Sequence, residues 1–330
     1  MDFTWENKSV LITGISGFLG AHLAEILTNK GAHVVGIVHD LKKNNYLGIK
    51  GLDKRIDVCQ ANILNHNRMR EIITNYDIKY IFHCAAESIV QKCTVDPLGV
   101  FNTNIMGTVS LLEAARVVGG VEGIMCMESD KTYGSFDSKD LPYKEDQAIK
   151  PTNVYEVSKA CTGLVAHAYS NNYSLPIFTI RGANLYGPGD MSISRLIPGS
   201  IMRVLRGEPP IVYSGVADYI REFIYVEDAA NAIIQLMEKI DKTKLHAINL
   251  GSGYKYNIKS IVELICSMLN TDYKPKIIEK DPVFKEIEEQ YLDLTKLKSF
   301  LPDFEPRELH EGLKKTISWY KELYDKKLLS

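Results

Sequence analysis

The sequence is poor in the features that mark membrane proteins and nucleic-acid-binding proteins. Its 330 residues carry 39 basic and 41 acidic side chains, which leaves a net charge of only −2. A balance this close gives no overall attraction to nucleic acid or to an anionic membrane surface. The most apolar stretch, Val10–Leu27, is interrupted by polar residues and falls short of the roughly 18 clean apolar residues of a membrane span. We therefore expect no nucleic acid and no membrane as partners.

Cysteine patterns are also missing. The six cysteines form no Cys-X-X-Cys pair and no zinc-ligand spacing, and several lie inside apolar runs such as Tyr80–Cys84. This predicts buried, reduced thiols in a reducing compartment, and nothing in the sequence resembles a metal site. The first residues lack the basic segment and the unbroken apolar segment of a secretory signal, so we expect a cytoplasmic protein.

Alternating apolar runs and amphipathic stretches fill the first half of the chain. Hydrophobic residues make up 45% of the sequence, enough for a large core, and the length suggests about two domains. The runs predict strands at 9–13, 33–38, 56–60, 79–84 and 123–127, with helices at 17–30, 67–76 and 95–118 between them. Such alternation predicts an α/β fold, a Rossmann-type doubly wound parallel sheet. After about residue 185 turn residues become dense, and helical stretches at 195–206, 226–239, 257–269 and 309–324 predict a smaller C-terminal α/β region.

Three glycines follow the first predicted strand at intervals of three. Gly14, Gly17 and Gly20 open the next predicted helix. A tight turn there needs residues without a Cβ atom, and the helix N-terminus offers N–H donors to a pyrophosphate. We predict a dinucleotide site formed by Gly14, Ser16, Gly17, Phe18, Leu19 and Gly20.

The end of the second predicted strand bears on the choice between NAD and NADP. Asp40 stands where an acidic residue grips the ribose hydroxyls of NAD, and no arginine is present to clamp a 2′-phosphate. Lys42 and Lys43 are close, so NAD is favoured without NADP being eliminated. The alternative role for Asp40 is a solvated loop residue.

Tyr155 and Lys159 form a Tyr-X-X-X-Lys pattern. An i, i+4 spacing places the phenol and the ammonium on one helix face. A free tyrosine has a pKa near ~10 and is a poor base at neutral pH, whereas a neighbouring ammonium and an oxidised nicotinamide both favour the phenolate. Combined with the glycine turn, the pair predicts a tyrosine base in a dinucleotide-dependent enzyme.

These motifs together resemble the extended short-chain dehydrogenase/reductase family, which acts on nucleotide sugars. The resemblance covers nearly the whole chain, in TGISGFLG at 13–20, HCAAES at 83–88, NIMGT at 104–108, YEVSK at 155–159, RGANLYGP at 181–188 and REFIYVED at 221–228. It implies an NAD-binding Rossmann domain at 1–184 plus about 222–250, and a nucleotide-sugar-binding region at 185–221 and 251–330. It also implies a homodimer formed through the helices at 95–118 and 152–170, for which Leu111, Leu112, Leu164 and Val165 supply apolar faces.

The resemblance assigns further site residues. It implies cofactor contacts from Asp40, Asn62, Ile63, Ala85, Ala86, Asn104, Tyr155 and Lys159, and substrate contacts from Glu87, Ser88, Asn184, Arg195, Leu196 and Arg221. The segment at 289–293 lacks the arginine that many relatives use on the diphosphate. Arg195 and Arg221 are expected to carry that charge instead, because guanidinium suits diphosphate oxygens.

The triplet Ser129-Asp130-Lys131 bears on the reaction. It resembles CDP-glucose 4,6-dehydratase; inverting UDP-N-acetylglucosamine dehydratases share the triplet but have the catalytic tyrosine within about ten residues, whereas Tyr155 here follows Lys131 by 24 positions. In the implied reaction Tyr155 takes the C4 hydroxyl proton as hydride passes from C4 to NAD. Ser129 hydrogen-bonds the C4 oxygen, Asp130 protonates the departing C6 hydroxyl, and hydride returns to C6.

Several alternatives stay open at this point. Lys131 either abstracts the C5 proton as a neutral amine or stabilises the enolate as an ammonium, and Asp130 and Lys131 together could instead form a solvated surface pair. The rival reaction is a nucleotide-sugar 4-epimerase that uses Tyr155 and Lys159 but needs no acid at C6. A protein of another class, a non-catalytic NAD-sensing binding module, would not need Ser129, Tyr155 and Lys159 all intact.

Overall fold

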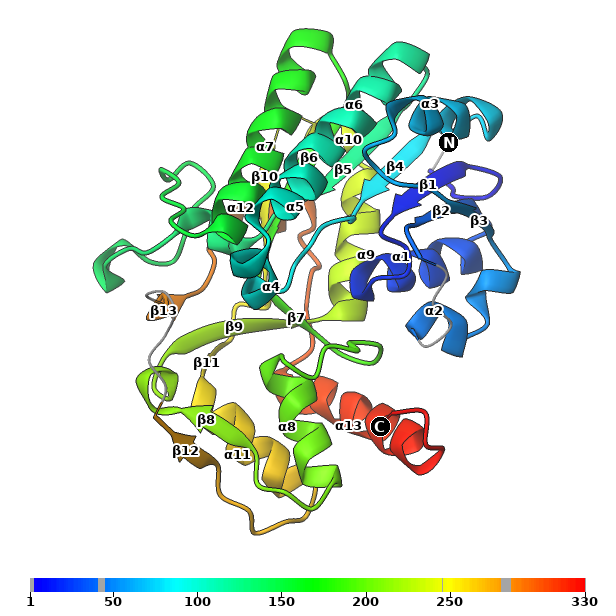
Figure 1. The fold of residues 1–330 in the computed structure, drawn as a ribbon. Helices are drawn as coiled ribbons and strands as arrows, with labels where there is room; N and C mark the ends of the chain where they lie inside the picture. The colour runs from blue at the N-terminus through cyan, green and yellow to red at the C-terminus, as the bar shows by residue number, and fades with distance from the viewer. Residues whose placement is uncertain (1–2, 41–44, 245, 280–285, 330) are drawn as a thin grey trace.

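The fold consists of a large parallel sheet covered by helices and a smaller unit below it (Figure 1). The computed structural model describes residues 3–40, 45–244, 246–279 and 286–329. Within these ranges no helix combines the length and the apolar character needed to cross a membrane.

The central sheet has seven strands, all parallel. Their order across the sheet is β10 (Ala247–Leu250), β6 (Ile177–Gly182), β5 (Gly123–Met127), β4 (Tyr80–His83), β1 (Ser9–Thr13), β2 (His33–Val38) and β3 (Asp57–Gln60). Parallel strands are buried on both faces, which explains why Val10, Leu11 and Ile12 form an unbroken apolar run and are all inaccessible to solvent. The predicted α/β class and the five predicted strands are confirmed, β3 and β4 being one or two residues shorter than expected.

Helices cover both faces of this sheet. The core on one face contains residues of α1 (Phe18–Asn29), α9 (Val226–Met237), α10 (Ile240–Thr243) and α12 (Thr295–Phe300). The opposite core contains residues of α3 (His66–Asn75), α6 (Gly107–Val118) and α7 (Val154–Tyr173). α7 begins with a complete capping box, in which the Asn153 side chain accepts from the Glu156 N–H and Glu156 accepts from the Asn153 N–H.

The prediction of one helix over 95–118 is wrong. α4 (Val90–Val95) ends at Asp96, whose side chain then caps α5 (Pro97–Phe101) by accepting from the Gly99 N–H at 2.9 Å. A π-helical segment, η2 (Asn102–Met106), leads into α6. Proline fits the first turn of a helix but cannot donate inside one, so the break falls just before Pro97.

The smaller unit consists of short strands and longer helices from two segments of the chain, one before β10 and one after it. β7 (Asn184–Tyr186), β9 (Ile220–Tyr225), β11 (Lys255–Asn257) and β13 (Glu289–Gln290) form one sheet, and β8 (Ile211–Tyr213) pairs with β12 (Lys276–Ile278). α8 (Leu196–Leu205), α11 (Ile258–Met268) and α13 (Leu309–Asp325) share a core with β7 and β9. The remaining short helices are α2 (Tyr46–Ile49), η1 (Leu52–Lys54), η3 (Asp130–Tyr133), η4 (Ser138–Asp140) and η5 (Ser214–Val216). The chain leaves the central sheet after β6 and returns to it with β10; the domain limits themselves stay a prediction.

Candidate active site

A cavity of about 780 Å³ lies between the two units, at the carboxyl ends of the central strands. Ligands of open parallel sheets bind at this edge, where loops from neighbouring strands converge. Every predicted site residue lines the cavity except Asp40, Asn104 and Arg221. The same cavity is therefore lined by all the predicted catalytic residues and by most of the predicted cofactor residues.

The glycine turn between β1 and α1 is suited to a dinucleotide. Gly14 has a φ of +67°, and a Cβ atom there would lie 2.7 Å from the backbone nitrogen of Ala85. A Cβ on Gly20 would overlap the Gly14 carbonyl oxygen. No side chain at these positions separates the backbone N–H groups of the α1 N-terminus from the cavity, which is what a pyrophosphate requires. Ser16, Gly17, Phe18 and Leu19 complete the turn and line the cavity.

Replacing Gly20 by alanine is expected to lower the free energy of unfolding by about 1–3 kcal/mol, because the new methyl group must displace backbone. Binding of NAD should weaken with it, since the turn that faces the pyrophosphate has to shift. Thermal unfolding and a fluorescence titration with NAD measure the two effects. Gly215→Ala is the matched control, because a Cβ at Gly215 meets nothing within 4 Å; equal behaviour of the two variants would contradict the interpretation.

The residues expected to contact the adenosine half of NAD differ in whether they line the cavity. Asn62 and Ile63 line the cavity, and the Asn62 side chain accepts from the Leu64 N–H at 2.9 Å. Asp40 is exposed and lies beside His39, which lines the cavity where Asp40 does not. Lys42 and Lys43 fall outside the described residues.

Asn104 acts on the backbone of the cavity wall. Its side chain accepts from the Glu87 N–H at 2.8 Å and donates to the Glu87 carbonyl and to the Ser158 hydroxyl. It thereby fixes the loop of Ala85, Ala86 and Glu87, which does line the cavity, to helix α7.

Tyr155 and Lys159 lie side by side on α7 and are both buried. Burial raises the pKa of Tyr155 to about 12, against an opposing effect of its hydrogen bond with Ser129. Burial lowers the pKa of Lys159 to about 8, and its ammonium donates to the Met127 carbonyl at 2.6 Å, at the end of β5. In this arrangement Tyr155 is a phenol at neutral pH, so a phenolate requires additional positive charge beside it.

Asp130 is a buried acid in the cavity wall. It opens η3, directly after β5, with Ser129 as the N-cap. One carboxyl oxygen accepts from the Ser129 hydroxyl at 3.1 Å, while the other, Oδ2, is buried without a hydrogen-bond partner among the residues that the structure describes. Burial raises the pKa of Asp130 to about 6, although the charges of Lys131 and Arg221 oppose the shift. A carboxyl group tuned in this way can carry a proton near neutral pH and donate it into the cavity.

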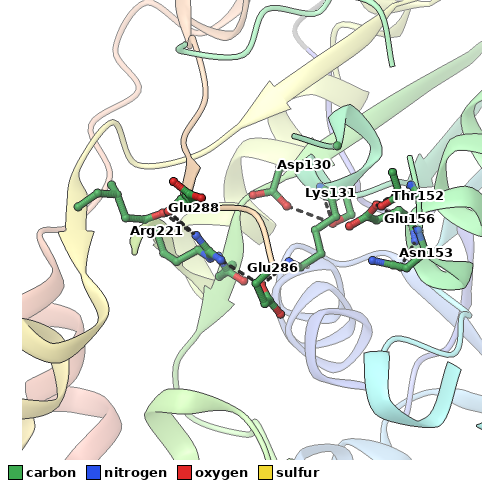
Figure 2. A network of polar contacts seen from close by, with 12 residues as sticks. Asp130, Lys131, Thr152, Asn153, Glu156, Arg221, Glu286 and Glu288 are labelled. Atoms are coloured by element: carbon green, nitrogen blue, oxygen red, sulfur yellow. Dashed lines mark hydrogen bonds and ion pairs between the residues drawn. The ribbon is translucent and has the colours of Figure 1, made fainter. Parts of the chain in front are cut away.

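Lys131 is held by an acid that the sequence gave no reason to expect. Its ammonium lies 3.9 Å from the Glu286 carboxylate, which also accepts from the Arg221 guanidinium at 3.0 Å. Arg221 does not line the cavity; its guanidinium also donates to the carbonyls of Ile220 and Glu288. Figure 2 shows Lys131 reaching toward Glu286, with Arg221 on the far side of that carboxylate. The solvated surface pair considered for Asp130 and Lys131 does not describe these two residues, since both line the cavity and Asp130 is only 3% exposed.

Of the expected substrate residues, all line the cavity except Arg221. Arg195, which precedes α8, donates to the buried Asp190 at 3.1 Å and to the Ser88 hydroxyl at 3.2 Å. Leu196 and Asn184 also line the cavity, and the Asn184 side chain donates to the Glu222 carbonyl at 3.1 Å. A guanidinium poised between the two units suits an anionic substrate.

Glu128 and His83 have structural partners. The Glu128 carboxylate packs against Gly163 of α7 and pairs with Arg181 at 3.2 Å. The two ring nitrogens of His83 lie within hydrogen-bond distance of the Thr13 and Thr108 hydroxyls, and burial lowers the pKa of His83 to about 3. His83 is thus neutral and tied into the sheet, as expected of a structural residue.

No group of three or more histidine, cysteine, aspartate or glutamate residues able to hold a metal occurs in the part of the chain that the structure describes.

The parallel sheet, the glycine turn and the buried tyrosine–lysine pair define a dinucleotide-dependent enzyme. A family model described as the NAD dependent epimerase/dehydratase family matches residues 10–251. The chain belongs to this family, and its cofactor is NAD.

Three similar proteins illustrate the range of reactions within the family. The chain is 30% identical over 324 residues to the trifunctional UDP-glucose 4,6-dehydratase/UDP-4-keto-6-deoxy-D-glucose 3,5-epimerase/UDP-4-keto-L-rhamnose-reductase of Arabidopsis thaliana, covering 95% of this chain and 47% of that protein. The chain thus spans about half the length of this curated relative. It is also 30% identical to a UDP-N-acetyl-alpha-D-glucosaminuronate decarboxylase of Bacillus cytotoxicus, over 96% of this chain and 98% of that one.

Among solved structures, a UDP-glucose 4-epimerase from Thermotoga maritima with UDP-glucose superimposes with a TM-score of 0.86 at 25% identity, covering 96% of this chain and 99% of that one. Dehydratase, decarboxylase and epimerase thus share one fold with this chain. The reaction must be argued from the site residues.

Proposed function

We propose that the chain is an NAD-dependent nucleotide-sugar 4,6-dehydratase, and that its substrate is CDP-glucose. The observation that carries the proposal is Asp130, a buried acid in the cavity wall whose pKa burial raises to about 6. Its Oδ2 atom has no hydrogen-bond partner within the described part of the chain. A 4,6-dehydratase must protonate a hydroxyl as it leaves C6. Epimerisation at C4 breaks no C–O bond and needs no such acid.

The proposed chemistry divides between two groups of residues. Tyr155 removes the proton of the C4 hydroxyl, and Ser129 hydrogen-bonds the C4 oxygen. When bound, NAD supplies the hydride acceptor for C4, a positive charge beside Tyr155, and the hydride that returns to C6. Elimination then breaks the C5–H and C6–O bonds and forms the C5=C6 double bond. Asp130 gives its proton to the departing oxygen, which leaves as water, and a base on the C5 side takes the C5 proton. A proton returns to C5 when the hydride adds to C6, so the net change is the loss of one water. Lys131 either is that base, as a neutral amine, or stabilises the enolate as an ammonium.

The choice of CDP-glucose rests on the triplet of Ser129, Asp130 and Lys131 and on its distance from Tyr155. The test is incubation with CDP-, dTDP-, GDP- and UDP-glucose, GDP-mannose and UDP-N-acetylglucosamine, each with NAD, followed by mass spectrometry. Loss of one water from CDP-glucose alone is the expected result. An unchanged mass with a new C4 epimer in the NMR spectrum would instead support an epimerase. Loss of carbon dioxide from a UDP-uronic acid, added as a further substrate, would support a decarboxylase.

We also propose that two copies of the chain associate through α4 to α7. Large apolar side chains are exposed on these adjacent helices, among them Val95 at 85%, Leu98 at 72% and Leu164 at 58%. Apolar side chains gathered on neighbouring helices are typical of a protein interface. Leu111 and Leu112, which were expected to share this face, instead lie in the core beneath the sheet.

The double variant Leu98→Asp, Leu164→Asp is expected to run as a monomer where the unaltered protein runs as a dimer, because burying two carboxylates at an interface is costly. Light scattering after size-exclusion chromatography measures the mass. Ile277→Asp, on β12 of the smaller unit, is the control at a similarly exposed position and should leave the dimer intact. A monomeric unaltered protein would contradict the proposal.

A further inference from the structure

The carboxylate of Glu286 joins two cations at the edge of the cavity. It lies 3.9 Å from the Lys131 ammonium and 3.0 Å from the Arg221 guanidinium. Glu286 itself lines the cavity, while the Arg221 side chain is only 7% exposed and lies behind it. The three groups thus lie in series, from the buried guanidinium through the carboxylate to the ammonium (Figure 2), and Lys131 lines the cavity.

Glu286 is held in this place by the sheet of the smaller unit. β13 pairs in parallel with β9, with Glu289 opposite Ile220 and Gln290 opposite Arg221. Arg221 then donates to the Glu288 carbonyl as well as to the Glu286 carboxylate, so the guanidinium fixes both the backbone and the side chain of this segment. A buried arginine used in this way serves as an anchor for Glu286, since its donors are already committed within the protein.

Lys131 is the member of the triplet that needs such support. It has a long flexible side chain. The carboxylate of its neighbour Asp130 accepts from the Ser129 hydroxyl at 3.1 Å, whereas the Lys131 ammonium forms an ion pair with Glu286 at 3.9 Å. An ammonium on a four-carbon stem loses much rotamer freedom when it is confined, so holding it beside Asp130 requires a partner.

We propose that Glu286 is a positioning residue for the elimination half of the reaction: anchored by Arg221, it holds Lys131 beside Asp130 on the C5–C6 side of the sugar. This inference rests on the proposed 4,6-dehydratase function. Glu286 does not act on the C4 hydroxyl. Tyr155 on α7 and Ser129 at the start of η3 act there. The two halves of the reaction therefore respond differently when Glu286 is altered.

Glu286→Gln, which keeps the shape and removes the charge, is expected to lower kcat for dehydration roughly 10- to 100-fold, the size of effect that a misplaced catalytic group causes. The KM should stay within about twofold, because Glu286 adds no attraction for an anionic substrate. Reduced nicotinamide should accumulate during turnover, since C4 oxidation continues while elimination is slowed. Exchange of the C5 hydrogen with deuterated solvent, read by mass spectrometry, should fall in step with kcat.

Three further variants separate positioning from a general structural role. Glu286→Asp should recover part of the lost rate. Glu288→Gln, at an exposed position two residues away whose side chain takes no part in the described ion pairs, is the matched control and should behave like the unaltered protein. In a Lys131→Met background, the additional change Glu286→Gln should have no further effect, because the two residues act as a unit.

Two results would overturn the inference while leaving the proposed function standing. One is a Glu286→Gln enzyme that dehydrates at the rate of the unaltered protein. The other is a parallel fall in C4 oxidation and in elimination, which indicates general damage to the fold. If the unaltered protein releases no water from any nucleotide sugar, the proposed function fails and this inference fails with it.

Discussion

Replacing Tyr155 by phenylalanine is expected to lower kcat by about 10²- to 10⁴-fold, the usual contribution of a general base. The phenol is buried, hydrogen-bonded with Ser129 and placed one helical turn before Lys159 on the cavity wall. Without it the C4 hydroxyl keeps its proton, so the first step of the reaction is blocked. Both product and reduced nicotinamide should be missing, and binding of NAD should be nearly unchanged.

The loss expected for Tyr155→Phe is specific to position 155. Tyr169 lies half-buried on the same helix and does not line the cavity, and its hydroxyl donates to Glu113 at 3.2 Å. Tyr169→Phe therefore removes the same atom from the same element and should leave kcat unaltered within about twofold. A Tyr155→Phe enzyme that keeps more than a tenth of the activity would exclude Tyr155 as the base. Stopped-flow absorbance of the nicotinamide and a product assay measure the two steps separately.

Replacing Asp130 by asparagine is expected to lower kcat for dehydration about 10²- to 10⁴-fold while C4 oxidation continues. Asparagine fits the space and can still accept from Ser129, but it has no proton of suitable acidity for the leaving C6 oxygen. Reduced nicotinamide should then build up to a stable level. The nucleotide sugar should be found as the 4-keto form, which has lost two hydrogens but no water. Asp137→Asn, on the exposed loop after η3, is the control and should keep full activity. Loss of both steps together in Asp130→Asn would show that Asp130 supports the fold rather than the elimination.

The same residue sets an expected pH dependence. Burial raises the pKa of Asp130 to about 6, and a general acid must be protonated to act. The rate of water release should therefore fall as the pH rises through about 6, in the direction opposite to a base-limited step. C4 oxidation should lack this limb, because Tyr155 is a base and becomes more effective as the pH rises. A water-release rate that increases from pH 5 to about pH 8 would contradict the assignment.

Local patterns predicted the parts of the site that are local in the chain. The glycine turn at 14–20 and the pair of Tyr155 and Lys159 each depend on spacing within one turn or one helix, and the structure places both on the cavity wall. The strands at 9–13, 33–38 and 123–127 were predicted with their observed bounds, since a fully buried strand has to be an apolar run.

The features that the sequence patterns did not predict are of two kinds. Some follow ordinary local preferences, and one depends on a contact between distant residues. The break at Asp96 and Pro97 follows the ordinary preferences for a helix start, and the strand β6, also unpredicted, is an apolar run like the others. Glu286 is a different case. Its partner Lys131 lies 155 positions earlier in the sequence, and only the pairing of β13 with β9 brings them together. No periodicity within a single segment contains that information.

The position of β10 has a consequence for how the protein is made. The central sheet grows outward from β1, first through β2 and β3 and later through β4, β5 and β6, in the order in which a ribosome delivers them. Its last edge strand, β10, arrives only after α8, β8 and β9 have emerged, and these await α11 and α13 for their core. A nascent chain that stops near residue 240 therefore exposes an unpaired edge of β6, the kind of edge on which strands from other molecules add. Chaperone engagement during translation should be strongest in that interval.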